Sequence, residues 1–344
     1  MEKTTVLVTG ATGFIGSHIL EALATRTNIN VIAACRDKSK LLPGFNGEIR
    51  QGNLTDGDYI SQLTHSVDVI CHAAAWTSLW AHRKEEQRLY RDPSKTLIDA
   101  AIKSGVKRFI FDSSVVVVGA HRDGTSVADH EPAIHPRFWP HMDIVVDIEK
   151  HMLNKSEQGM TMVALRCGHF VGERYNLGLL SLLLPRLKTH MVPWVAKGKS
   201  RVPLVHAKDV AKAYMLSTIT DNLTGFCSFN ICGPSFPTMK EVIEFLHTET
   251  GVPKPHFGVP IWGAYMFGWL MEKLNFILPG DPFLTRAIVY LGEDWHAPSD
   301  LAKKQLAYIP ETDWREAIRI QLRDMESHGY PHTPLVDGLR WWSR

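Results

Sequence analysis

The first half of the chain alternates short, almost wholly apolar runs with segments of helical pattern. The apolar runs predict buried strands at 6–8, 31–34, 67–70, 108–111 and 161–166. Segments between or after them predict helices at 15–24, 95–103 and 144–153. After about Gly172 the loops lengthen, and helices are expected at 259–277, 283–291, 298–306 and 313–327. Because strands without a polar face are typical of a parallel sheet covered on both sides, we predict an α/β protein. Its doubly wound parallel sheet is followed by a smaller, mostly helical C-terminal part.

The composition narrows the function classes. With 344 residues, 44% of them hydrophobic, the chain is too apolar to be disordered and long enough for two domains. Its 38 Lys and Arg against 36 Asp and Glu give a net charge of +2, which argues against nucleic acid as a partner. The five cysteines are scattered and lack the spacing of a zinc site. We therefore expect a cytoplasmic protein without a metal.

No signal peptide or transmembrane span is expected, because the chain runs directly into a predicted strand and its uncharged stretches are short. The stretch 257–271 contains Pro260 and falls short of the roughly 20 residues that span a bilayer. The wider segment 259–278 is apolar almost all round, so it is a buried helix, lines a lipophilic pocket, or lies on a membrane or a partner. Peripheral membrane contact stays open. Trp341 and Trp342 suggest a tail that packs on the protein, or an exposed aromatic pair.

The strongest local pattern is the segment 9–16, Thr-Gly-Ala-Thr-Gly-Phe-Ile-Gly, which follows a predicted strand and opens a predicted helix. In that place Gly10 permits a tight turn, Gly13 lets the backbone approach a pyrophosphate, and Gly16 lets the helix pack closely on the strand. The free N–H groups at the helix start would then face the phosphates. An ordinary glycine-rich turn is the alternative, but the alternating strands and helices favour a nucleotide. The candidate cofactor residues of this turn are Gly10, Thr12, Gly13, Phe14, Ile15 and Gly16.

The end of the second predicted strand distinguishes two cofactors. Arg36 follows Gly16 by about 20 residues, where an acidic residue would bind the ribose of NAD and an arginine suits the 2′-phosphate of NADP. Lys38 and Lys40 add positive charge nearby. We therefore favour NADP(H) over NAD(H). In the alternative, Arg36 is solvated and Asp37 holds the ribose.

Further motifs follow the glycine turn in a fixed order. Segment 52–56 contains Asn53 and Leu54, segment 72–75 reads His-Ala-Ala-Ala, and segment 111–119 contains Ser113 and Ser114. Segment 165–168 reads Leu-Arg-Cys-Gly, and segment 205–211 reads Val-His-Ala-Lys-Asp-Val-Ala. Together these motifs resemble the extended short-chain dehydrogenase/reductase superfamily, of the NAD-dependent epimerase/dehydratase type, over nearly the whole chain. The helical C-terminal part is most similar to the 3β-hydroxysteroid-dehydrogenase-like branch.

The resemblance implies a division of the chain and a set of cofactor contacts. It implies a Rossmann-type NAD(P)-binding domain at 1–172 and 203–235, and a substrate-binding domain at 173–202 and 236–344. It also implies a homodimer as a frequent state of the family. Beyond the glycine turn, the implied cofactor residues are Arg36, Asn53, Leu54, Ala73, Ala74, Ala75, Cys167 and His169. Cys167 stands where the family has proline.

The catalytic residues that the resemblance implies are largely missing. The family uses Ser, Tyr and Lys, with Asn in support, but none of the eight tyrosines here has a lysine four positions later. Counting back from Glu149, the Tyr position holds His141 and the Lys position holds Val145. Tyr90 stands where the family has Asn, and Ser114 remains.

The replacements still contain candidate catalytic residues. Histidine, with an unperturbed pKa of about 6.5, needs no neighbouring lysine to exchange a proton near neutrality. Ser114, His141 and Tyr90 are therefore the candidates. A structural histidine at 141 and a packing tyrosine at 90 are the alternatives.

Three functions follow from these residues. The first is an NADP(H)-binding oxidoreductase, or a related epimerase or dehydratase, that acts on a small, apolar ketone or alcohol with Ser114 and His141. The second is a non-redox enzyme on the same fold, for cyclisation, elimination or lyase chemistry. The third is a non-catalytic protein that senses NADP or binds a partner. Fold alone does not separate them.

Overall fold

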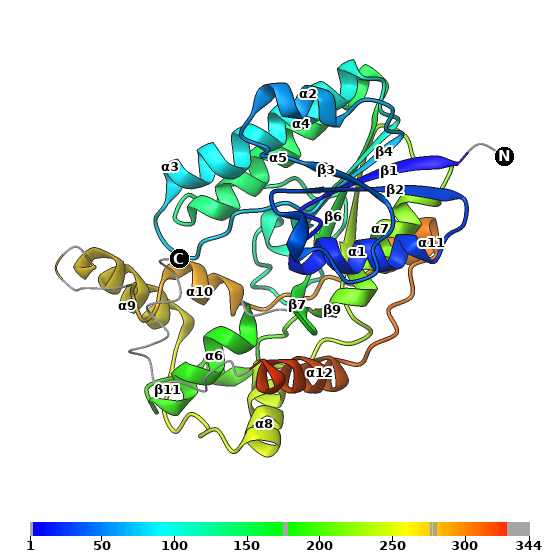
Figure 1. Cartoon of the computed structure of the whole chain (residues 1–344). Helices are drawn as coiled ribbons and strands as arrows, with labels where there is room; N and C mark the ends of the chain where they lie inside the picture. Colours follow the sequence, from blue (N-terminus) through cyan, green and yellow to red (C-terminus); the bar gives the residue numbers. More distant parts are fainter. Residues whose placement is uncertain (1–2, 175–177, 276, 278–280, 329–344) are drawn as a thin grey trace.

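A seven-stranded parallel sheet forms the centre of the protein (Figure 1). The computed structural model describes residues 3–174, 178–275, 277 and 281–328. The strand order is β10-β6-β5-β4-β1-β2-β3, so the chain winds outward from β1 in both directions. The strands are β1 (Thr4–Thr9), β2 (Ile29–Cys35), β3 (Glu48–Gln51), β4 (Val69–His72), β5 (Arg108–Ser114), β6 (Thr161–Cys167) and β10 (Phe226–Ile231). This topology confirms the predicted doubly wound sheet.

Helices cover both faces of the sheet. One face carries α1 (Phe14–Ala24), α7 (Ala207–Ile219) and α11 (Asp300–Leu306), and the other carries α2 (Gly57–Leu63), α4 (Asp92–Lys103) and α5 (Pro140–Lys155). Successive side chains of β1 point to opposite faces of the sheet. Val6 and Val8 pack in the hydrophobic cluster beneath α1, whereas Leu7 packs in the cluster beneath α4. All three side chains are fully buried. A strand with two buried faces explains why the apolar runs have no polar alternation.

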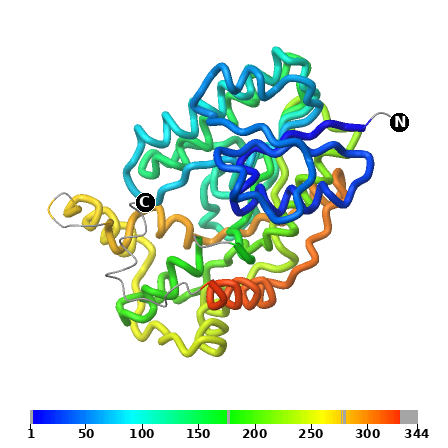
Figure 2. Tube along the Cα trace, in the orientation of Figure 1, coloured from blue at the N-terminus to red at the C-terminus, as the bar shows by residue number. Residues whose placement is uncertain are grey.

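A smaller, mostly helical part occupies the lower half of the view in Figures 1 and 2. Its short strands pair as β7 (His169–Val171) with β9 (Leu204–His206), and β8 (Trp194–Val195) with β11 (Gly258–Val259). Its helices are α6 (Leu179–Lys188), α8 (Met239–Thr250), α9 (Ile261–Leu274), α10 (Arg286–Leu291) and α12 (Trp314–Ser327). A third hydrophobic cluster holds α6, α8 and α12 together. The helical C-terminal part is thus as predicted.

The apolar pattern missed several elements of this fold. It did not predict β3 or α2, nor the helices α6, α7 and α8. Helix α8 begins with a capping box, in which the Thr238 hydroxyl accepts from the Glu241 N–H and the Glu241 carboxylate accepts from Thr238. The proposed domain division stays a prediction. Within its C-terminal range, α11 packs against α7 and β10 of the sheet.

Helix α9 falls within the apolar segment 259–278, and one side of it is not buried. Trp262 and Met266 are 66% and 60% exposed, and Trp269 and Leu270 are exposed beside them. The alternative of a buried helix therefore holds only for the other side of α9, where Ala264, Gly268 and Glu272 are buried. No helix within the described ranges is long and apolar enough to cross a membrane. The predicted tail at Trp341 and Trp342 lies outside the described residues.

Candidate active site

The glycine turn between β1 and α1 has the geometry of a phosphate-binding turn. Gly10 has a φ of +68°, and a Cβ there would lie 2.7 Å from the backbone nitrogen of Ala74. A Cβ on Gly16 would lie 2.0 Å from the Gly10 carbonyl oxygen. Helix α1 begins at Phe14 without a side-chain cap on Gly13. The first N–H groups of α1 and its positive end are therefore free to bind an anion. Thr12, Phe14 and Ile15, which we predicted as cofactor residues, lie at this helix start.

Two further predicted cofactor segments lie at the same edge of the sheet. Arg36 directly follows β2 and is exposed, and its carbonyl accepts from the Gln51 side chain at the end of β3 at 3.0 Å. Asn53 and Leu54 come just after β3. Asp37, the alternative ribose ligand, accepts from the N–H and hydroxyl of Ser39, and these bonds lower the pKa of its carboxyl group. The geometry brings both alternatives to the expected edge.

His72, the first residue of the 72–75 motif, has a structural role. Its Nδ1 lies 2.7 Å from the Thr9 hydroxyl oxygen, and its Nε2 lies 2.9 Å from that of Ser94. Burial lowers its pKa to about 3. The imidazole therefore links β1, β4 and α4 as a neutral ring, while Ala73, Ala74 and Ala75 follow the strand toward the glycine turn.

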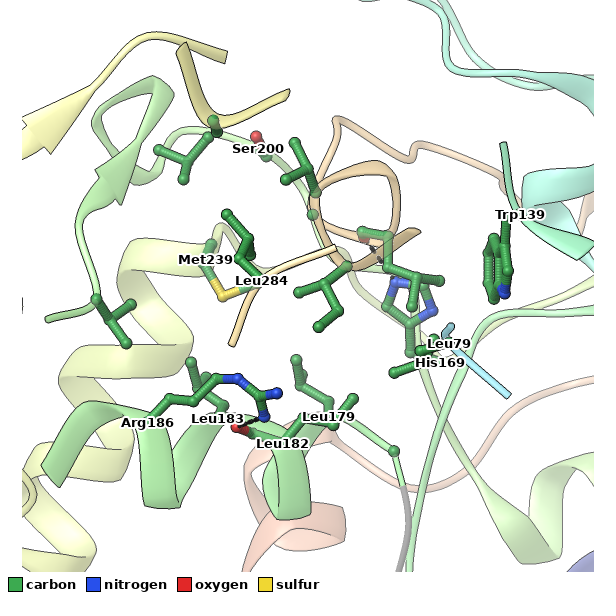
Figure 3. Close-up of a pocket in the computed structure, with 18 of the residues that line it drawn as sticks. Leu79, Trp139, His169, Leu179, Leu182, Leu183, Arg186, Ser200, Met239 and Leu284 are labelled. Atoms are coloured by element: carbon green, nitrogen blue, oxygen red, sulfur yellow. Dashed lines mark hydrogen bonds between the residues drawn. The ribbon is translucent and has the colours of Figure 1, made fainter. Parts of the chain in front are cut away.

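A cavity of about 640 Å³ lies between the sheet and the helical part (Figure 3). Its wall on the sheet side includes Ala75, Tyr90, Ser114, His141 and His169, which are five of the predicted site residues. The wall on the other side comes from α6, β8, α9 and α10. Most of the lining is apolar. The structure thus brings the predicted catalytic residues to one space, next to Ala75 of the cofactor segment.

The two serines at the end of β5 have different partners. The Ser113 hydroxyl donates to the Glu149 carboxylate at 2.5 Å, and Glu149 forms a buried ion pair with Arg166 at 2.8 Å. Ser114 is half-buried, and its hydroxyl donates a long hydrogen bond of 3.5 Å to the carbonyl of Cys167. Ser113 therefore has a structural bond, and the Ser114 hydroxyl is the one held more loosely at the cavity.

His141 is the second residue of α5, and aromatic rings hold it in place. Its ring stacks on Tyr90 with centroids 5.8 Å apart and an interplanar angle of 16°, and Trp139 lies at 5.9 Å. Nδ1 is buried and faces Oε1 of Glu86 at 3.7 Å. Burial lowers the pKa of His141 to about 4, against an opposing contribution from the Trp76 backbone. The imidazole is therefore neutral near pH 7, with one nitrogen turned toward a carboxyl group.

Glu86 and Asp112 are two site residues that the sequence did not reveal. Glu86 is fully buried, and burial raises its pKa to about 8. Asp112 lines the cavity, and burial raises its pKa to about 7 although the Cys167 side chain acts in the opposite direction. Glu86 stands in a charged run that reads as solvated. Asp112 did have a signal, because it interrupts the apolar run of β5 just before the serines.

The position that motif spacing predicts for the family's lysine is an apolar part of the wall. Val145 lines the cavity one turn after His141. Lys150 lies on the same helix but is exposed, and its Nζ is 3.3 Å from Nδ1 of His135. Among the described residues that line the cavity, Arg186 is the only lysine or arginine. No displaced lysine among these residues replaces the missing one.

The sheet, the glycine turn at its edge and the cavity beyond it define a dinucleotide-binding enzyme of the α/β class. The chain belongs to the NAD dependent epimerase/dehydratase family, whose sequence model matches residues 6–232. This membership confirms the family that the motifs predicted, with the Tyr-x-x-x-Lys motif absent.

Relatives cover nearly all of the chain at low identity. A putative dihydroflavonol 4-reductase of Synechocystis is 24% identical over 95% of this chain and 96% of its own. A 3 beta-hydroxysteroid dehydrogenase/Delta 5-->4-isomerase of Mycobacterium tuberculosis is 24% identical over 91% of this chain and 88% of its own. The structure of MoeE5 with UDP-glucuronic acid and NAD has a TM-score of 0.71, with 21% identity over 94% of this chain and 99% of its own. The likeness to that structure is one of fold.

Proposed function

We propose that the protein is an NADP(H)-dependent oxidoreductase that acts on a small apolar ketone or alcohol, with His141 and Ser114 at the reacting oxygen. The observation that supports this most directly is that both residues line the same cavity as Ala75. Tyr90 holds the His141 ring by stacking rather than by exchanging a proton. Burial and the neighbouring Asp112 raise the pKa of Tyr90, so its hydroxyl stays protonated.

The residues at the glycine turn fit a dinucleotide. The turn has no room for a side chain at Gly16 and no side-chain cap on α1, so backbone N–H groups are left for phosphate oxygens. A reduced nicotinamide, when bound, supplies the hydride. The protein must then orient the substrate, exclude water and provide a proton at the substrate oxygen.

Glu86 and His141 together hold the proton that this reaction needs. Between about pH 4 and about pH 8 the pKa values of the two groups leave the Glu86 carboxyl group protonated and His141 neutral. As the substrate oxygen gains negative charge, His141 donates an N–H proton to it and accepts the Glu86 proton on Nδ1. The separation of 3.7 Å exceeds hydrogen-bond length and must shorten when substrate binds. The Ser114 hydroxyl donates a hydrogen bond to the same oxygen.

The cavity lining supports an apolar substrate, such as a sterol, terpenoid or polyketide-like compound. Arg36, exposed at the end of β2, supports NADP(H) over NAD(H) because a guanidinium pairs with a 2′-phosphate. We also propose a cytoplasmic homodimer, given five free cysteines and the family resemblance. The exposed side of α9 supports peripheral membrane contact.

Turnover of a ketone panel with NADPH tests this function. His141→Gln should lower kcat by about 10²- to 10⁴-fold, the usual contribution of acid–base catalysis, without changing NADPH binding. His151→Gln is the matched control, because His151 lies on the same helix and bonds to Asp99 outside the cavity lining. Unchanged turnover in His141→Gln would contradict the role of His141.

Val145 favours a second candidate function, non-redox chemistry on the same fold. A valine at the lysine position offers no hydrogen bond to a nicotinamide ribose, and Val145 lines the cavity. Cyclisation, elimination or lyase chemistry would use Asp112 and His141 as acid and base. The same assay separates the two candidates, since this one predicts product without a net change in nicotinamide absorbance.

A further inference from the structure

Among the described residues that line the cavity, one carries a permanent positive charge. Arg186 projects from α6 among apolar side chains, on the side of the view opposite Trp139 and His169 (Figure 3). Ser114 and His141, where the reacting oxygen is proposed to bind, belong to the sheet side of the cavity. The cavity therefore has a reactive end, an apolar middle and a cationic end. The apolar neighbours of Arg186 in Figure 3 are Leu179, Leu182, Leu183, Met239 and Leu284.

The guanidinium of Arg186 has backbone partners, and the one acidic side chain that acts on its charge, Asp281, lies beyond ion-pair distance. Its Nε donates to the Phe283 carbonyl at 3.0 Å, and its Nη1 donates to the Leu182 carbonyl at 2.8 Å. Across the described ranges, no Asp or Glu oxygen lies within ion-pair distance of it. A guanidinium has five N–H donors, so two bonds to carbonyl groups leave donors for a ligand.

Three other partly or fully buried arginines have a direct acidic partner, whereas Arg108, which donates to the Ser217 and Thr218 carbonyl groups, has none but lies outside the cavity lining. Arg166 pairs with Glu149 at 2.8 Å, Arg201 with Asp294 at 2.6 Å, and Arg286 with Glu272 at 2.7 Å. A charge held among apolar groups is unfavourable unless an opposite charge accompanies it. In the three pairs the protein supplies that charge itself. At Arg186 the protein supplies only the more distant Asp281, although the side chain lines a ligand-sized cavity.

A carboxylate fits this position better than a diphosphate. Its two oxygens match the parallel N–H donors of one guanidinium. A diphosphate carries more negative charge, and no second lysine or arginine occurs among the described cavity-lining residues. The apolar wall between Arg186 and the reactive end suits a hydrocarbon body.

We propose that Arg186 binds a carboxylate of the substrate, so that the substrate is an apolar ketone or alcohol with a carboxylate remote from the reacting oxygen. The position of that oxygen rests on the proposed function. The carboxylate site itself rests on Arg186 and the cavity around it.

Calorimetric binding of octanoate and methyl octanoate to the full-length protein tests the carboxylate site without turnover. Octanoate should bind at least about tenfold more tightly than its ester, the ratio expected for a charged hydrogen bond. Arg186→Gln should remove that difference by weakening octanoate binding alone, and Arg186→Lys should retain part of it. Lys188→Gln is the matched control, because Lys188 is an exposed cation on the same helix outside the cavity lining.

Three results would overturn the site. The first is equal binding of the acid and the ester to the native protein, and the second is an equal loss of affinity for both in Arg186→Gln. The third is binding of UDP-glucose that depends on Arg186 while binding of octanoate does not. NADPH binding and thermal unfolding of each variant exclude a general loss of fold. If His141→Gln retains turnover while Arg186 still selects octanoate, only the proposed function fails. If turnover depends on His141 but octanoate is not selected, only the carboxylate site fails.

Discussion

The glycine turn and the α5 wall of the cavity lie at the same edge of one sheet, yet they relate to the family in opposite ways. The turn keeps its glycines, because backbone N–H groups bind phosphate whatever side chains surround them. On the wall, motif spacing predicts that His141 and Val145 stand at the positions of the family's tyrosine and lysine, and both residues line the cavity. Proton transfer depends on side chains, so the wall can change its chemistry while the turn stays the same.

A buried polar network supports the wall from beneath. Ser113 bonds to Glu149, and Glu149 pairs with Arg166, which joins α5 to β5 and β6. Arg166 also donates to the carbonyl groups of Asp129 and Glu131. The wall is therefore held by the strands beneath it, and His141 and Val145 line the cavity on this support.

The largest expected effect breaks that network. Glu149→Gln leaves the Arg166 charge buried without its partner, so the free energy of unfolding should fall by about 4 kcal/mol. Denaturant titration measures the loss. Glu316→Gln, in an ion pair whose side chains are 67% and 49% exposed, should cost less than about 1 kcal/mol. Similar losses in the two variants would contradict the supporting role of the buried pair.

The next effect concerns the turn. Gly16→Ala places a Cβ 2.0 Å from the Gly10 carbonyl oxygen. We therefore expect the free energy of unfolding to fall by about 3 kcal/mol and nucleotide binding to be lost. Gly57→Ala is the control, since nothing lies within 4 Å of a Cβ there. Denaturation and nucleotide calorimetry measure both quantities. Retained nucleotide affinity in Gly16→Ala would show that the turn does not depend on this close approach.

A smaller expected effect is the pH dependence of stability that Glu86, behind the α5 wall, produces. The pKa of Glu86 is raised from 4.5 to about 8 in the folded state, so the folded protein binds more protons than the unfolded chain between these values. Stability should therefore fall by about 2 kcal/mol between pH 6.5 and pH 8, the range above the unfolded histidine pKa. Glu86→Gln should flatten this slope, leaving the smaller part due to Asp112, whose pKa is raised to about 7. An unchanged slope would mean that Glu86 is ionised in the folded protein.

The smallest expected effect concerns the preference between NADP(H) and NAD(H) at the end of β2. Arg36→Ala should weaken NADP(H) binding about tenfold and leave NAD(H) binding unchanged, because only the former has a 2′-phosphate. Asp37→Asn should leave NADP(H) binding nearly unchanged. Calorimetry with both nucleotides measures the ratio, and a selective loss of NAD(H) affinity in Asp37→Asn would favour the alternative in which Asp37 holds the ribose.

The parts of the protein that sequence patterns predicted are those with local causes. Apolar runs without alternation indicated β1, β2, β5 and β6, because a strand buried on two faces has no polar side. Short or edge elements such as β3 and α2 escaped detection, since their sequences lack that signal. At the site, motif spacing led to Ser114, His141 and Tyr90, and the structure places all three on one cavity.

The sequence by itself determined the alternating α/β order, the glycine turn and the loss of Tyr-x-x-x-Lys, because each depends on residue types at short spacing. Only the tertiary structure decided that Glu86 faces His141, that Asp112 lines the cavity, and that Arg186 lies there with no described Asp or Glu within ion-pair distance. Burial and the pairing of charges depend on segments that meet only when the chain folds. A charged residue in a solvated run and one inside a cavity look the same in sequence, and their surroundings set their chemistry.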